Sequence, residues 1–210
     1  TSQVKAVDLE GLESSERVDV DLWTQGGYSD LMQRSQALLA RLEGGMEHNP
    51  TRALQQLLSH DLPALREEFT DLVHQARMAV LSSQLRVNIA DLVVQSLEAQ
   101  HFFFAEGHYD AEDMRRAYSA SLKNLAGEEV VIQVHPRGAD SLDNDLHIIS
   151  LDRSQSTEHD FRQRFLKVQS NLTENGLVVE QTREVRLTAN EQGHLRSSKP
   201  LAIHRPLAHP

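Results

Sequence analysis

The sequence predicts an α+β protein in which an N-terminal helical hairpin with a coiled-coil stalk precedes a small antiparallel meander of four to five strands packed by helices. Two observations predict this class. Between Pro63 and Gly107 no glycine or proline interrupts an apolar repeat with 3-4 spacing, which is typical of a long helix. After Gln100 apolar and polar residues alternate, and the links are too short for parallel crossovers, which favours antiparallel strands.

The composition fits a packed domain joined to more open parts. The chain has 210 residues, of which 39% are hydrophobic and 5% aromatic, and its mean hydropathy is -0.47. This length allows one or two domains. We expect an acidic flexible arm over residues 1–29, a helical coiled-coil region over 30–85, an α+β domain over 86–185 and a disordered tail over 186–210.

Charge and residue usage exclude several functional classes. The formal net charge of -10 argues against bulk affinity for nucleic acid or an anionic membrane, because phosphate groups attract a positive field. The chain has no cysteine, which excludes disulfides, thiolate catalysis and thiolate metal sites. No apolar run is long enough to span a membrane, and the acidic N-terminal segment does not resemble a signal peptide. We therefore expect a cytoplasmic protein without a cofactor.

Capping and breaking residues divide the helical region into three predicted helices. Ser29 is a typical helix cap, and Gly44-Gly45 is a typical stop. Asn49-Pro50 combines a capping side chain with a proline suited to the first helical turn. A break is expected near Asp61 and Pro63, with Asp61 capping the third and longest helix.

The apolar stripe of the third helix has the spacing of a coiled-coil seam. We expect this seam to be covered by the two preceding helices, by a second copy of the chain, or by both. The predicted association residues are Leu58, Leu62, Leu65, Phe69 and Leu72.

Alternation over the next segments predicts the strands of the meander. Three consecutive aromatic residues, Phe102-Phe103-Phe104, begin the first of them; the core would bury one or two of these rings, and an exposed one would mark an interface. A helix capped by Ser156-Thr157 and ended by Asn175-Gly176 is expected to cover one face of the sheet. The other strands are predicted over 116–123, 130–135, 146–151 and, as a fifth, 177–185.

The stretch EVVIQVHPRGADSLDNDLHIISLD is the most chemically suggestive part of the sequence. Its loop contains Asp140, Asp143 and Asp145, but it has neither the ligand spacing nor the glycine of a calcium loop. Strand parity places His135 and His147 on the face opposite the apolar residues, where the two rings are able to meet. A hairpin with a solvated loop is the favoured interpretation, and a metal-assisted hydrolase using these five residues is the alternative.

Other catalytic and phosphate-binding patterns are weaker. Glu158, His159 and Asp160 are consecutive on a predicted helix, so they point in different directions and do not form a triad. No P-loop or dinucleotide-binding pattern is present in the sequence. A basic set on the solvent side of the last helix, together with the tail, supports a further alternative, an accessory nucleic-acid-binding subunit. A solvated helix face with a flexible tail explains these charges more simply. That set is Arg162, Arg164 and Lys167.

The leading hypothesis is a non-catalytic adaptor or assembly subunit. It would self-associate or dock through the coiled coil and bind a protein partner through its α+β head. The apolar seam, the acidic charge and the failure of the catalytic patterns favour this hypothesis, which predicts protein partners and a homo-oligomer.

Overall fold

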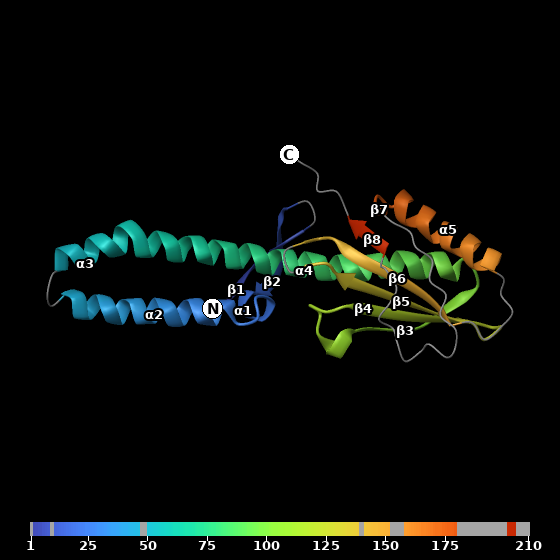
Figure 1. Ribbon diagram of the computed structural model, residues 1–210, viewed down its shortest axis with the longest axis horizontal. Helices are drawn as coiled ribbons and strands as arrows, with labels where there is room; N and C mark the ends of the chain where they lie inside the picture. The colour runs from blue at the N-terminus through green and yellow to red at the C-terminus, as the bar shows by residue number, and fades with distance from the viewer. Residues whose placement is uncertain are drawn as a thin grey trace. The chain divides into compact units, whose positions relative to one another are not determined.

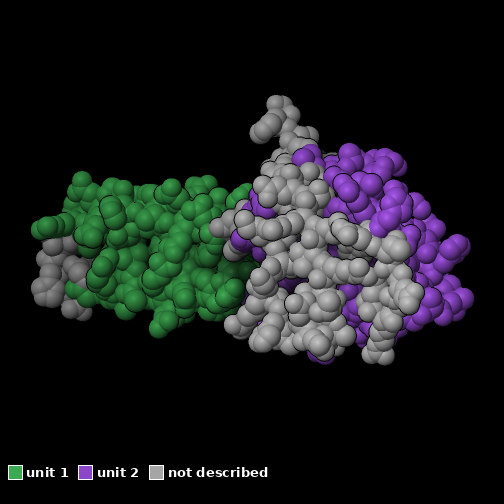
Figure 2. Space-filling view, turned by 45° about the vertical axis from the view of Figure 1, so that its right-hand side comes forward, with its two compact units in different colours: residues 1–81 green, residues 82–210 purple. Residues whose placement is uncertain are grey.

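Helices and antiparallel strands together build the protein, which confirms the predicted α+β class. The computed structural model describes residues 2–8, 11–46, 50–138, 141–151, 158–179 and 201–204. The chain divides into two units, residues 1–81 and 82–210 (Figure 2). This division falls inside the longest helix.

The first unit contains a small hairpin of strands followed by helices. Its strands are β1 (Gln3–Val7) and β2 (Glu13–Asp19). Its helices are α1 (Val20–Trp23), α2 (Gly27–Met46), α3 (Pro50–Gln56), a π-helical turn η1 (Leu57–Asp61) and the beginning of α4 (Leu62–Glu98).

The structure differs from the flexible arm expected over residues 1–29. Strands β1 and β2 pair antiparallel, and Ala6, Val18 and Val20 form a buried cluster with Ala76 of α4. Arg77 of α4 also donates from Nε to the carbonyl of Lys5 at 3.0 Å. Asp8, Glu13 and Glu16, three of the acidic residues that suggested an arm, are exposed, so they leave the buried cluster intact.

The first of the three predicted helices is α2 in the structure, and both its start and its end are shifted. Helix α2 begins at Gly27, so Ser29 lies within its first turn. The carboxylate of Asp21 accepts from the Ser29 backbone N–H at 2.7 Å and from its hydroxyl at 2.9 Å. The helix also continues through Gly44 to Met46, because a glycine costs a helix only about 1 kcal/mol.

The break expected near Asp61 and Pro63 is replaced by the π-helical turn. Helix α3 begins at Pro50 as predicted and continues through η1 into α4. Pro63 has no N–H for the carbonyl four residues before it, and its ring crowds that carbonyl. A wider turn directly before the proline relieves this crowding, so the helical course is kept.

The second unit is an antiparallel sheet with helices. Strands β3 to β6 are consecutive neighbours, as the predicted meander requires, and the described strands continue the sheet in the order β3-β4-β5-β6-β8-β7 (Figure 1). The short strand β8 lies within the segment expected to be a tail. The elements are β3 (Phe102–Tyr109), a 3-10 turn η2 (Asp110–Glu112), β4 (Tyr118–Asn124), β5 (Glu129–Pro136), β6 (Asn144–Leu151), α5 (Glu158–Glu174), β7 (Val178–Val179) and β8 (Leu201–His204).

One face of this sheet carries the core of the second unit. The pairs Leu122↔Val130 and Ala120↔Ile132 place buried side chains on that face. Helix α4 lies against it, because the Tyr109 hydroxyl is 2.8 Å from the Ser83 hydroxyl. Helix α5 covers the same face, since its Arg164 guanidinium lies 4.6 Å from the Phe102 ring centre.

Candidate functional site

In the first unit, α2 runs antiparallel to η1 and the first part of α4 (Figure 1). Leu31 of α2 is buried, and Leu38 and Leu65 are half-buried between the helices. The rings of Tyr28 and Phe69 have their centres 6.3 Å apart. These contacts define a two-helix hairpin, and the coiled coil expected from the heptads remains a prediction.

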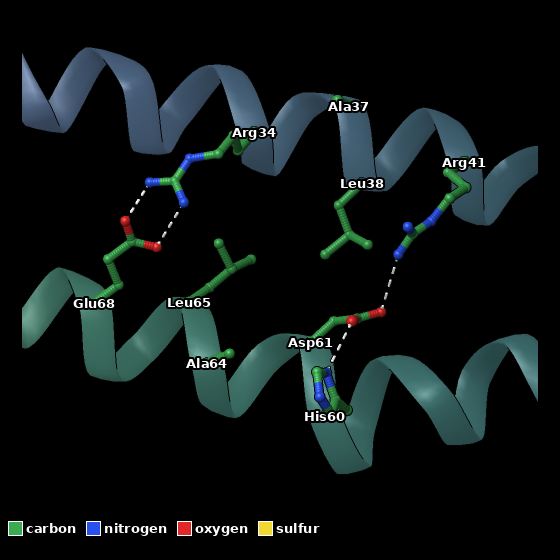
Figure 3. A pocket seen from close by; sticks show the side chains of 9 residues that line it. All are labelled: Arg34, Ala37, Leu38, Arg41, His60, Asp61, Ala64, Leu65 and Glu68. Carbon is green, nitrogen blue, oxygen red and sulfur yellow. Dashed lines mark hydrogen bonds and ion pairs between the residues drawn. The ribbon is translucent and has the colours of Figure 1, made fainter.

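One flank of the hairpin is closed by ion pairs, as Figure 3 shows. Both guanidinium nitrogens of Arg34 donate to the Glu68 carboxylate, one of them at 2.9 Å. Arg41 donates to Asp61 at 3.4 Å. Between these pairs lies an open groove of about 420 Å³ with an apolar floor. The floor residues are Ala37, Leu38, Ala64 and Leu65.

The charges along this groove are mutually satisfied. The hydrogen bond with Glu68 raises the pKa of Arg34, and Nδ1 of His60 lies 3.3 Å from the Asp61 carboxylate. His60 and Arg34 are exposed, so neither is held in the desolvated environment that tunes a catalytic acid or base. The ion pairs therefore join the two helices, and the groove has the chemistry of a packing surface.

The opposite flank of the hairpin is apolar and open. Successive helical residues are about 100° apart, so Leu62 and Phe69 turn away from Asp61 and Glu68. We call this surface the apolar flank. Its residues and their exposed fractions are Met32 40%, Leu39 56%, Leu58 65%, Leu62 46% and Phe69 40%.

The predicted association residues therefore separate into two groups. Leu65 and Leu72 are half-buried, with Leu65 on the floor of the groove and Leu72 close to Gly27 of α2. Leu58, Leu62 and Phe69 lie on the apolar flank. Met32 and Leu39 were not among the predicted association residues, although their seven-residue spacing on α2 places them on one side of that helix.

In the second unit, His135 and His147 meet across β5 and β6. Their ring centres are 5.1 Å apart, and the register pairs His135 with Asp145 and Gln133 with His147. Burial lowers the pKa of both histidines, and the neighbouring His135 lowers that of His147 further. The strand parity predicted from the sequence is confirmed by the burial of the residues that alternate with His135.

The aspartates expected beside these histidines have other contacts. Arg137 donates from Nε to Asp145 at 2.7 Å, and its backbone N–H donates to the Asp143 carbonyl at 3.1 Å. Asp140 lies outside the described residues. Among the residues that the structure describes, no three histidine, aspartate or glutamate side chains are grouped to hold a metal ion.

The basic set predicted on α5 is also divided. Arg162 and Lys167 are exposed. Arg164 is turned inward: its guanidinium donates to the Glu128 carboxylate at 3.2 Å and stacks on Phe102. The expectation that Arg164 lies on the solvent side of α5 was wrong, because a buried carboxylate and an aromatic face hold its charge within the fold.

Comparison with other proteins adds no functional assignment. No protein-family model, curated protein or solved structure matches the chain. None of the described helices is both long and apolar enough to cross a membrane.

Proposed function

We propose that the protein is a non-catalytic assembly subunit that self-associates through the helical hairpin and binds a protein partner through its α+β head. The observation that carries this proposal is the asymmetry of the hairpin. Arg34–Glu68 and Arg41–Asp61 close one flank, whereas the other flank exposes five large apolar side chains.

The size of the apolar flank suits a second copy of the chain. A fully exposed large apolar side chain has a surface of about 200 Å². Multiplied by the exposed fractions of its five residues, this gives the apolar flank an exposed surface of roughly 500 Å². This lies in the upper range of apolar patches on monomers, and two such patches approach the apolar part of a standard interface of about 1,600 Å². Two hairpins related by a two-fold axis would then form a four-helix bundle.

Sedimentation velocity over a range of protein concentrations tests the self-association. We expect the wild-type chain to form a dimer that dissociates on dilution. Leu39→Glu and Leu62→Glu should each shift the protein to monomer, because a carboxylate on the apolar flank would be desolvated without a partner charge.

Leu125→Glu is the matched control. Leu125 is 95% exposed in the turn between β4 and β5, so this variant should remain a dimer. Circular dichroism checks that all variants keep their helical content. A wild-type chain that stays monomeric, or a dimer that survives both hairpin substitutions, would contradict the proposal.

A further inference from the structure

Strand β3 is an edge of the sheet in the second unit. It pairs with β4, and none of the described strands pairs with its other side. All residues from Phe103 to His108 are exposed. Alternate residues of a strand direct their N–H and C=O groups to opposite sides. Within the described part of the chain, the outer side of β3 therefore presents backbone donors and acceptors that pair with no other strand.

This edge lacks most of the features that protect edge strands from pairing. Such strands are usually very short or carry lysine or proline. Strand β3 has 8 residues with neither type, and its Phe103 and Phe104 are 57% and 48% exposed. The one irregularity is a shift of register between Phe104 and Glu106.

Both ends of β3 are anchored to the rest of the unit. At its start, Phe102 is buried beneath the Arg164 guanidinium. At its end, the Tyr109 ring packs edge-on against Tyr118 at 5.1 Å between centres, and its hydroxyl contacts Ser83. The exposed middle is thus held extended, so a partner that pairs with it pays little to order it.

We infer that β3 accepts an extended peptide segment of a partner protein as an additional strand. The inference rests on the proposed function, for which it supplies the binding mode of the head. A row of unpaired backbone groups is matched by another strand. Phe103 pairs with Lys123 and Phe104 with Leu122, so the two rings lie on opposite faces of the sheet.

The side chains along β3 define the chemistry of this segment. It carries an apolar residue toward each face, which covers the two phenylalanine rings. It also carries a basic residue, because Glu106 is exposed on the strand and the chain has a net charge of -10. The shifted register disfavours β3 of a second copy, since two irregular edges would have to match along their length.

Selection from random peptides of about ten residues tests the inference without a known partner. The peptides are displayed against the immobilised wild-type protein. The selected sequences should alternate apolar and polar residues, contain lysine or arginine and lack proline in the paired stretch, because proline has no N–H to donate.

Two variants locate the binding site of these peptides. Phe103→Lys places a charge at the edge and removes a ring, and it should weaken binding at least about tenfold. Leu166→Lys makes the same kind of change at an exposed position on α5 and should bind like wild type. Peptides that bind Phe103→Lys and wild type equally would overturn the inference, as would a selection that yields no binders.

Amide hydrogen exchange of the wild-type protein provides a readout independent of any variant. Peptide binding should slow the exchange of backbone amides between Phe103 and His108. Binding without this protection would overturn the inference, and a dimer disrupted by Phe103→Lys would identify a second copy as the occupant instead. Peptide binding that persists in a monomeric Leu62→Glu protein separates this test from that of self-association.

Discussion

The two parts of helix α4 carry the same kind of apolar stripe, but the chain covers them differently. In the first unit, Leu62 and Phe69 remain about half exposed. In the second unit, Ile89, Val93 and Leu97 are fully buried. The sequence spacing is alike in both parts, so periodicity identifies the apolar face of a helix and leaves open what covers it.

The elements that face each stripe explain the difference. A sheet offers a wide apolar surface, and Leu122, Val130 and Ile132 are fully buried on the face that α4 covers. In the first unit, the helix that pairs with α4 touches it along a narrow seam, and its Arg34 and Arg41 are used for ion pairs on one flank. The hairpin therefore leaves Leu62 and Phe69 of the α4 stripe partly exposed, whereas the sheet buries Ile89, Val93 and Leu97 of the same stripe.

Replacing one leucine with alanine in each part of α4 should give the largest difference in the free energy of unfolding. Leu97→Ala should lower the free energy of unfolding by about 3–5 kcal/mol, because it removes a fully buried side chain from a close-packed core. Leu62→Ala should cost less than about 1 kcal/mol in the monomer. Urea unfolding measures both, at a protein concentration low enough to exclude self-association. Equal losses would show that the hairpin stripe is covered within one chain.

The sequence predicts those features of the fold that depend on short-range periods. The length of α4 and the faces of β5 follow from spacing along a single element. The order of β3 to β6 follows from the short links between successive strands. The parity of His135 and His147 follows from the same alternation. It left open whether the two rings meet, and in the structure their centres lie 5.1 Å apart.

Features that depend on contacts between residues far apart in the sequence could not be predicted from such local spacing. The inward turn of Arg164 requires Glu128 and Phe102, which no local pattern connects to α5. The π-helical turn replaces an expected break because α3 and α4 continue as one helical course past Pro63. For the candidate site, the heptads predicted Leu58, Leu62 and Phe69, whereas the division into two flanks needed the pairing of α2 with α4.

Buried and exposed ion pairs provide a second, smaller contrast. Glu128 accepts from Arg164 at 3.2 Å and from the Asn124 amide at 2.7 Å, and its side chain is buried. Glu128→Ala should destabilise the protein by about 2–3 kcal/mol in urea unfolding, because it leaves the Arg164 charge in the interior without this carboxylate.

The adjacent Glu129 supplies the control for this prediction. Its carboxylate lies 3.7 Å from the Lys123 ammonium, and both side chains are far more exposed. Glu129→Ala should cost less than about 1 kcal/mol. Equal losses of unfolding free energy from both substitutions would contradict this prediction. They would show that the buried Glu128–Arg164 pair stabilises the head no more than an exposed ion pair does.

The smallest expected effect is the dependence of stability on pH, which should arise in the head. Burial lowers the pKa of His135 and His147 in the folded protein below the value of 6.5 expected for an unfolded chain. As the pH falls below 6.5, the unfolded chain binds protons more readily than the folded one, so the free energy of unfolding decreases. It levels off once the pH is below the folded-state pKa of both histidines.

Substituting the histidines singly shows whether this pH dependence belongs to the pair. His135→Gln and His147→Gln should each make the loss of stability between pH 7 and about 5 less steep. An unchanged slope in both head variants would contradict the assignment.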